Sequence, residues 1–580
     1  MCNFVGARLL APALLILGIC TALSAQANSS ELLRQTLDEY WQKQLEDSLY
    51  LRIKFGLPIT KLPDPTYEAA KQDADFCKSI LQKLDRVHAT EISHEEFLSL
   101  EILRWECSQV NALLPFFWHG SPITPYASSL SMVREAFSGY QLSSKKDGED
   151  YVALLKEVPQ YADRLFTTVQ EQTARGIRIP KEELQLVIPF LSSFMLEGEQ
   201  SPFFVQADRR QSLDSHFSEE VIRIINEKIN PSFQRLIASF NDEYRNQAPD
   251  AVGVAQYPGG KEYYRALVRF HTTMDVTPEQ VHEIGQEAVR RLQQRMKTVR
   301  DQLKFEGTQA EFHERLKKDP RFIPKTAEEI GERLLYHDAR IAPKIAQYFS
   351  LKPKAPHTVK RLDPSMEGAM TFGYYQVPTK RDSSGTYYYN GSNLSERPLF
   401  NSASLVFHEL VPGHHFQINL QSENESLPAF RREGGHTAFM EGWAEYASSL
   451  AEEMGMYQDP YELYGRLAAE MFLTVRLVVD TGMNYYGWSR EKAMEFMKAN
   501  LLESETQIRT ESLRYSCDIP GQALGYKMGM MKFRALRDKT EKALKDKYDI
   551  RKFHAAVLGS GSMPMTVLEQ HIDKFIESAE

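Results

Sequence analysis

The sequence contains little cysteine and no excess of positive charge. Only 5 of the 580 residues are cysteines, and 69 Lys and Arg stand against 78 Asp and Glu, a formal net charge of −9. A chain without a basic excess is poorly suited to bind a phosphate backbone, so we expect no nucleic acid partner. Low-complexity tracts and fixed-period repeats are also absent, which excludes linker-like and solenoid proteins and indicates an ordinary globular chain.

Three of these five cysteines would remain in the mature protein. Cys2 and Cys20 lie in the N-terminal segment, which leaves Cys77, Cys107 and Cys517. Three cysteines cannot build a disulfide framework, and no Cys-x-x-Cys motif occurs. Cys77 and Cys107 are expected either to pair across a helical hairpin or to stay as buried thiols.

An apolar run stands out near the N-terminus. It extends from Leu9 to Leu23, follows Arg8 and precedes the small-residue motif Ala25-Gln26-Ala27. This order is typical of a secretory signal, here residues 1–27 with cleavage after Ala27, and the run is too short for a stable membrane span. We therefore expect export to the periplasm or to the outside, without membrane insertion.

Cys20 leaves a lipoprotein alternative open. Lipoprotein signals place a small residue directly before the lipidated cysteine, whereas this chain has Ile19 there. Lipidation is therefore the less favoured interpretation.

Most of the remaining chain follows the 3.6-residue period of amphipathic helices. The clearest start is Thr277, an N-cap followed by Pro278 and Gln280. Comparable helical stretches are expected near residues 31–55, 67–110, 219–246, 326–349, 460–479 and 532–546. A β-hairpin is expected between residues 370 and 391, where two tyrosine-rich runs flank a turn-like segment. The sequence predicts a mainly α fold with a small β element.

A dense cluster of histidines marks the candidate site. His408, Glu409, His414 and His415 fall within the segment HELVPGHH. A zinc peptidase needs two imidazoles to hold the metal and a carboxylate beside the first one to deprotonate the activated water. The segment therefore predicts zinc ligands, with Glu409 as the general base.

The spacing of this segment departs from the usual His-Glu-x-x-His motif. Position i+4 from His408 is Pro412, and on a regular helix His414 would lie about 120° off the face of His408. Because Pro412 cannot donate to the carbonyl of His408 and Gly413 adopts unusual dihedrals, we expect a bulge. Two looped-out residues would make His414 the second ligand and three would make it His415, and we favour His414.

The third ligand is expected from residues 436–446. Glu441 and Glu445 lie one helical turn apart among apolar and aromatic residues. A carboxylate in such surroundings needs a partner, and a metal supplies one. We predict that Glu441 binds zinc and that Glu445 supports a ligand imidazole by a hydrogen bond.

Four segments together resemble one bacterial family. They are HELVPGHHFQ, EGWAEYASSL, VVDTGMNYYGWS and RYSCDIPGQALGYKMG, at residues 408–417, 441–450, 478–489 and 514–529. They are similar to the family called domain of unknown function 885, which is grouped with the gluzincin-type zinc metallopeptidases. Asn484 departs from the family, in which a histidine is expected.

The resemblance implies a fold like that of angiotensin-converting enzyme and thimet oligopeptidase: two helical lobes around a deep cleft, with a small sheet near the metal. A single catalytic region of residues 28–580 would then divide into lobes 28–365 and 366–580. The resemblance also implies that Tyr526 stabilises the oxyanion. For Arg514 two roles stay open, binding of a substrate carboxylate or a structural ion pair.

The leading hypothesis is an exported zinc peptidase acting on short peptides, as a carboxypeptidase or an oligopeptidase. Two alternatives remain: a non-catalytic peptide-binding protein, and a zinc hydrolase of non-peptide amides or esters. The intact His408-Glu409 pair argues against the non-catalytic alternative. Oligomeric state and residue preference have no signal in the sequence.

Overall fold

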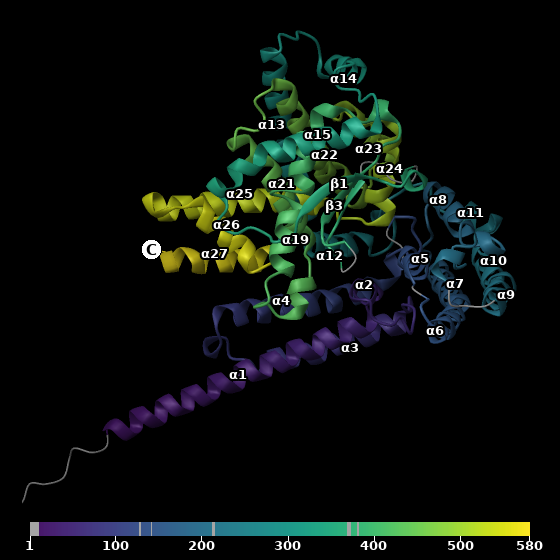
Figure 1. Cartoon of the computed structure of the whole chain (residues 1–580), viewed down its shortest axis with the longest axis horizontal. Helices are drawn as coiled ribbons and strands as arrows, with labels where there is room; N and C mark the ends of the chain where they lie inside the picture. Colours follow the sequence, from purple (N-terminus) through teal and green to yellow (C-terminus); the bar gives the residue numbers. More distant parts are fainter. Residues whose placement is uncertain are drawn as a thin grey trace, which may run out of the picture.

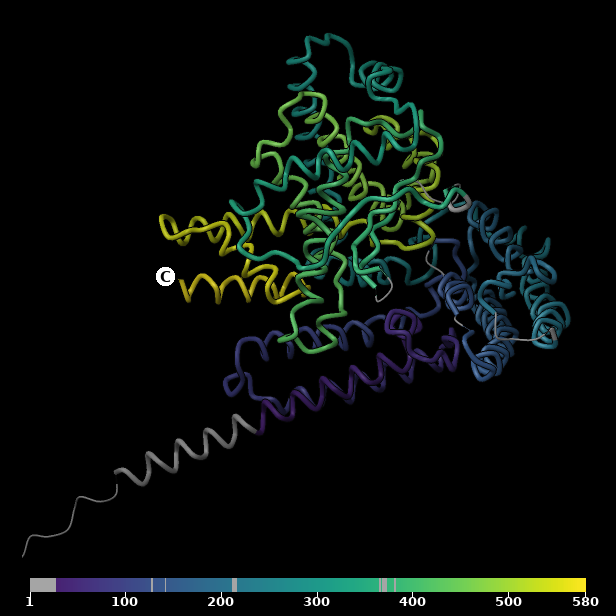
Figure 2. The backbone as a smooth tube through the Cα atoms, viewed as in Figure 1, coloured from purple at the N-terminus to yellow at the C-terminus, as the bar shows by residue number. Residues whose placement is uncertain are grey.

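The computed structural model describes residues 11–579 except 127–128, 141, 211–214, 368–372 and 380–381. Residues 1–10 of the predicted signal peptide, and 370–372 and 380–381 of the predicted hairpin, lie outside the described residues. The described chain is mainly helical, as predicted, and Figures 1 and 2 trace its path.

The N-terminal helices lie along one side of the body, with α1 beside α3 at the bottom of Figure 1. Their bounds are α1 (Ala11–Asp47), α2 (Leu49–Phe55), α3 (Tyr67–Leu84) and α4 (His94–Leu113). The predicted stretch 67–110 is thus two helices, because Ser93 and Glu96 form a capping box that starts α4. Cys77 on α3 and Cys107 on α4 are free thiols, and so is Cys517.

A separate group of helices follows, at the right of Figure 1. It consists of α5 (Ser129–Gly139), α6 (Lys145–Leu155), α7 (Val158–Ala174), α8 (Lys181–Ser192), α9 (Ser215–Ile224), α10 (Asn230–Ala238) and α11 (Asp242–Gln247). A π-helical turn, Ile225–Ile229, joins α9 to α10.

The next helices lead to the sheet and include the predicted start at Thr277. They are α12 (Gly260–Thr272), α13 (Pro278–Gln302), α14 (Gln309–Lys318), α15 (Ala327–Ile341), α16 (Ile345–Tyr348) and α17 (Pro364–Glu367). The Thr277 hydroxyl accepts from the Gln280 N–H at 3.3 Å, and the Gln280 side chain accepts from the Thr277 N–H at 2.9 Å. The capping signal therefore places the start of α13 as predicted.

The sheet has three strands in the order β1-β3-β2. Their bounds are β1 (His357–Arg361), β2 (Gly373–Gln376) and β3 (Gly385–Tyr389). β2 pairs with β3 in antiparallel fashion, with Tyr375 opposite Tyr387, which confirms the hairpin. β1 pairs with β3 in parallel and was not predicted, because its five residues are too few for a clear period.

The C-terminal helices carry most of the predicted site residues. They are α18 (Ser402–Glu409), α19 (His414–Ser422), α20 (Ala429–Glu433), α21 (Thr437–Glu453), α22 (Pro460–Asn484), α23 (Arg490–Asn500), α24 (Glu505–Leu513), α25 (Leu524–Leu544), α26 (Ile550–Gly559) and α27 (Met565–Ala579). Between α24 and α25 lies a π-helical segment, η10 (Arg514–Asp518).

Buried apolar side chains of the described residues gather in three clusters. The largest joins Leu33 on α1 to Trp443 on α21 and Ile576 on α27. The second ends at Ala248 and holds the α5–α11 group, and the third starts at Val252 and centres on α13 and α22. The first and third clusters contain residues from both sides of the predicted boundary between 365 and 366, so the core is not divided there.

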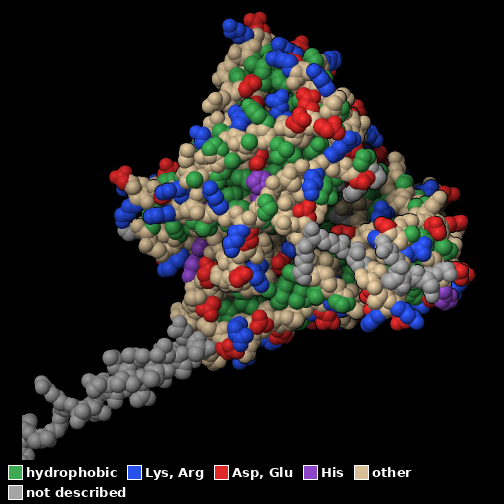
Figure 3. Space-filling view, in the orientation of Figure 1, with side chains coloured by type: hydrophobic (Ala, Val, Ile, Leu, Met, Phe, Trp, Pro, Cys, Tyr) green, Lys and Arg blue, Asp and Glu red, His purple; other side chains and the backbone are tan. Residues whose placement is uncertain are grey.

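The surface drawn in Figure 3 mixes Lys and Arg side chains with Asp and Glu. Within the stretches that the structure describes, no helix combines the length and the apolar character that crossing a bilayer requires.

Candidate metal centre

The chain breaks its helix between the two predicted histidine ligands. α18 ends at Glu409, and α19 begins at His414. Gly413 is needed in the connection, because a Cβ there would lie 1.8 Å from the carbonyl oxygen of His408. The indole N–H of Trp443 donates to the Pro412 carbonyl at 2.9 Å and ties the connection to α21.

The break brings His408, His414 and Glu441 together. Their ligand atoms all lie within 4.8 Å of one another. Nε2 of His414 is 3.2 Å from Oε2 of Glu441, and Nε2 of His408 is 3.7 Å from the same oxygen. Donor atoms around a tetrahedral zinc ion lie about 3.4 Å apart, given Zn–N and Zn–O distances near 2.1 Å. The three side chains therefore fit a zinc ion with one position left open.

The charges around these side chains favour a bound cation. Burial lowers the pKa of His408, but Glu441, Glu445 and Glu409 outweigh it and raise this pKa to about 10. Burial raises the pKa of Glu441, yet His414 and His408 hold it well below its usual range. Surroundings that stabilise an imidazolium this strongly would also stabilise a metal ion.

Glu409 is half-buried beside the ligands. Burial raises the pKa of its carboxyl group, and the charges of His408 and His414 offset part of that shift. A raised pKa suits a general base, which must accept a proton and later release it. Glu409 also lies near strand β3. Its charge acts on Tyr387 of that strand and, together with burial, raises the pKa of the Tyr387 phenol.

Glu445 lies behind His408 and is only 2% exposed. Its Oε2 is 3.7 Å from Nδ1 of His408, which is an electrostatic contact longer than the predicted hydrogen bond. Its Oε1 is 2.8 Å from Nη2 of Arg466, which lies 3.2 Å from Glu470. Glu470 in turn pairs with Lys527, the residue after Tyr526.

These contacts form one buried chain of alternating charge, which we call the ion network: Glu445, Arg466, Glu470 and Lys527. Sequence reasoning missed Arg466, Glu470 and Lys527. The available signal was the presence of charged residues in largely apolar helical runs, Arg466 and Glu470 in the run that forms α22 and Lys527 near the start of α25. The network connects the back of His408 to the helix that carries Tyr526.

His415 points away from the triad. Its Nδ1 is 2.9 Å from the Tyr375 hydroxyl, and its Nε2 is 3.1 Å from the Ala355 carbonyl. Burial, with the nearby charge of His357, lowers the pKa of His415 to about 4. Its contacts attach the sheet to α19, and the structure brings His414 rather than His415 to the other ligands.

Tyr526 lies at the site, and its ring is parallel to that of His408 at a centroid distance of 6.4 Å. Burial and the charge of Glu441 raise the pKa of the phenol to about 12, so it stays a hydrogen-bond donor. Two glycines let the helix of Tyr526 approach α21: a Cβ at Gly442 would lie 2.5 Å from the Cα of Gly529. This close crossing places Tyr526 near Glu441.

Arg514 makes an ion pair within the protein. Its guanidinium lies 3.4 Å from Glu511 and donates to Gln522 at 2.9 Å. Asn484, where a histidine was expected, is buried and donates to the Tyr515 carbonyl at 2.8 Å. It accepts from the Val254 N–H at 3.1 Å, so it holds the backbone together instead of facing the triad.

The ligand assignment predicts opposite results for two neighbouring histidines. His414→Ala should remove zinc, because it deletes one of three converging donors. His415→Ala should retain about one zinc per chain but melt at a lower temperature, because it removes the buried hydrogen bonds of His415 with the Tyr375 hydroxyl and the Ala355 carbonyl. Metal analysis of both purified variants checks this, and loss of zinc only from His415→Ala would show that the assignment is wrong.

These features define a class of protein: a mainly helical chain in which two short helices and one buried helix bring a His-His-Glu set together beside a second glutamate. The chain belongs to a bacterial family described as "Bacterial protein of unknown function (DUF885)", whose model matches residues 51–572. Among curated proteins, none matches the sequence.

Solved structures share this fold. One from Colwellia psychrerythraea, described as a "putative lipoprotein", is 25% identical, with a TM-score of 0.85 over 96% of this chain and 99% of that chain. One from Shewanella oneidensis, described as a "putative lipoprotein of unknown function", is 17% identical, with a TM-score of 0.73 over 93% of this chain and 99% of that chain.

Proposed function

We propose that this chain is an exported zinc peptidase of gluzincin type that hydrolyses short peptides. The observation that carries the proposal is the convergence of His408, His414 and Glu441 with Glu409 beside them. The donor set suits zinc, which prefers imidazole and carboxylate ligands. When bound, zinc would act as a Lewis acid on the scissile carbonyl and on the attacking water.

The residues of the chain would then handle the protons. Glu409 takes a proton from the attacking water as the water oxygen bonds to the carbonyl carbon. It gives that proton to the leaving nitrogen as the C–N bond breaks, which regenerates its carboxylate. Tyr526 donates its hydroxyl to the oxyanion that develops on the former carbonyl oxygen.

The ion network would hold two of these groups in place. Glu445 fixes the charge behind His408, and Lys527 anchors the helix beside Tyr526. Groups that act on a transition state must be held rigidly, and buried partners supply that rigidity.

Export is part of the proposal. The apolar run and the small-residue motif near Ala27 support a secretory signal. Both solved structures of similar fold carry the description "putative lipoprotein", which also supports a place outside the cytoplasm. That description gives the Cys20 alternative more weight than the sequence alone does.

The proposal predicts that purified protein holds about one zinc per chain and cuts short peptides. Chelation should abolish cleavage and added zinc should restore it, because the zinc would be the Lewis acid that acts on the scissile carbonyl and on the attacking water. The measurement combines elemental analysis with a mixed-peptide digest read by mass spectrometry. Protein without zinc, and without any gain on adding zinc, would contradict the metal centre; zinc without peptide cleavage would favour a binding protein or a non-peptide hydrolase.

A further inference from the structure

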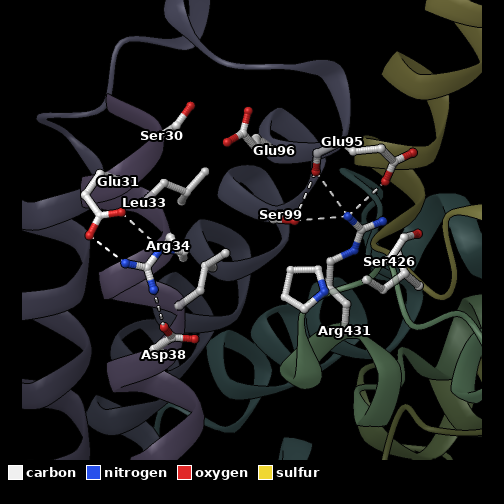
Figure 4. A pocket seen from close by; sticks show the side chains of 13 residues that line it. Ser30, Glu31, Leu33, Arg34, Asp38, Glu95, Glu96, Ser99, Ser426 and Arg431 are labelled. Atoms are coloured by element: carbon white, nitrogen blue, oxygen red, sulfur yellow. Dashed lines mark hydrogen bonds and ion pairs between the residues drawn. The ribbon is translucent and has the colours of Figure 1, made fainter. Parts of the chain in front are cut away.

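Two cavities lie away from the triad, and they differ in their polar groups. The larger, about 450 Å³, lies between α1, α4 and α20. Its charged side chains are already paired: Arg34 contacts Glu31 and Asp38, and Arg431 contacts Glu95 and Ser99 (Figure 4). This cavity therefore offers a ligand few unsatisfied charges.

The smaller cavity, about 240 Å³, lies where the α5–α11 group meets the rest of the body. It is lined by the start of α8, the segment before α12, α12 itself and the end of η10. At about 30 Å³ per water, it has room for roughly eight waters or a small organic molecule. Its position at the seam between two apolar clusters is common for ligand sites.

Unpaired polar atoms from several elements line this smaller cavity. Apart from the hydrogen bond that the carboxyl group of Glu183, on α8, shares with Asp518, its two oxygens have no partner among the described residues, although the side chain is only 1% exposed. Oδ1 of Asp518, on η10, is likewise unpaired. So is Nδ1 of His119, whose Nε2 lies 2.8 Å from the Pro258 carbonyl and must carry the proton. The two acids share one proton, and apart from it these atoms are hydrogen-bond acceptors.

The two acids retain one proton near neutral pH and carry a single negative charge between them. Burial, followed by the charge of Asp518, raises the pKa of Glu183 to about 9. Burial raises the pKa of Asp518 to about 6, against the lowering effect of its hydrogen bonds and of Arg514. The cations nearest these acids are already engaged, Arg490 with Glu182 and Arg514 with Glu511.

Other groups on the walls are neutral or hold other partners. His271 on α12 has an unpaired Nδ1, and burial lowers its pKa to about 4. Burial raises the pKa of the Tyr257 phenol and of the Cys517 thiol, so both stay protonated. Arg178 donates to the Gln247 side chain, and its Nε is an unpaired donor.

The geometry disfavours a metal ion here. Among the described residues, the only set of three ligand atoms close enough for one ion is the His408, His414 and Glu441 triad. The walls of the cavity also include apolar side chains, namely Ile177, Ile179, Val254, Leu267 and Pro520. Such walls suit an organic body, and an ammonium group supplies three donors and no acceptor.

We propose that this cavity is a second binding site, which takes the primary ammonium group of a small organic amine between Glu183 and Asp518, with the apolar part of the ligand against α12. The site does not depend on the metal centre. A free amine and the N-terminal residue of a peptide carry the same group, and the Arg178 Nε–H would donate a hydrogen bond to the carbonyl oxygen of the latter.

Binding should be linked to pH with a defined sign. Below pH 9 the free protein holds a proton on Glu183, and the ammonium group must displace it. Affinity for an alkylamine such as n-pentylamine, which stays protonated over this range, should therefore rise between pH 6 and pH 9, by up to tenfold per pH unit, with up to one proton released per ligand bound.

The test is isothermal titration of the purified full chain with n-pentylamine and, as a neutral match, 1-pentanol. Leucinamide and N-acetylleucinamide form the second pair, which separates a peptide-like ligand from a simple amine. Glu183→Gln and Asp518→Asn should each weaken amine binding at least tenfold, because a charge-assisted hydrogen bond is lost. Glu197→Gln, at an exposed glutamate of the same helical group, is the matched control and should bind as wild type.

Each outcome decides the proposal. Binding of either amine, lost in both cavity variants and kept in the control, supports it; stronger binding of leucinamide would identify a peptide-like ligand. The proposal is overturned if neither amine binds at millimolar concentration, because the two acids would then share only a proton. It is also overturned if the alcohol binds as well as the amine. Equal binding by a folded Glu183→Gln variant, judged by its melting curve, or stabilisation by calcium chloride alone, would overturn it too.

Discussion

Replacing Glu409 by Gln should lower peptide turnover by at least about 100-fold while the fold and the zinc content stay near those of the wild type. The amide matches the carboxylate in size but cannot take a proton from water. Glu409 is not one of the three converging ligands, so the metal should stay bound. The measurements are initial rates on a short peptide, zinc content and a melting curve, made on the same preparation.

A matched control separates the role of this side chain from a general loss of charge. Glu425→Gln changes an exposed glutamate in the loop after α19 and should keep full activity. If Glu409→Gln retains more than about a tenth of wild-type turnover, Glu409 is not the base. If it loses zinc, the residue has a ligand or structural role that the geometry does not show.

Local signals predicted the parts of the molecule that depend on neighbouring residues. The cap at Thr277 and the tyrosine-rich hairpin required only a few adjacent positions, and both are in the structure. The capping box at Ser93 is a local signal as well, and it divides the predicted stretch 67–110 into α3 and α4. β1 was missed because its pairing with β3 is non-local.

The candidate site shows where such reasoning stops. Pro412 and Gly413 predicted a break in the helix, but only the folded chain shows which histidine the break turns toward Glu441. The contact of Arg466 with Glu445 joins two different helices, and that of Glu183 with Asp518 joins residues far apart in the chain. Tertiary packing decides such contacts, and no spacing rule reports them.

The ion network is expected to matter for stability as much as Glu409 does for turnover. Arg466 is 1% exposed and lies between Glu445, 2% exposed, and Glu470, 9% exposed. Arg466→Met would take from Glu445 its cationic partner on the side away from the metal site. It would leave Glu470 paired with Lys527 alone. Removing one partner of a buried ion pair typically costs about 3–5 kcal/mol, because the remaining charge stays buried and uncompensated.

We therefore expect Arg466→Met to unfold at much lower temperature and denaturant concentration than the wild type, with metal-free protein used throughout so that zinc does not mask the effect. Arg295→Met is the control: Arg295 pairs with Glu452 at 2.9 Å, but the two side chains are 46% and 39% exposed, so its loss should cost less than about 1 kcal/mol. Adding Glu445→Gln to Arg466→Met should recover part of the stability, since it removes one of the uncompensated carboxylates.

An Arg466→Met protein as stable as the control would show that the network contributes nothing. If the double variant is instead less stable than Arg466→Met, Glu445 is not the carboxylate that Arg466 compensates.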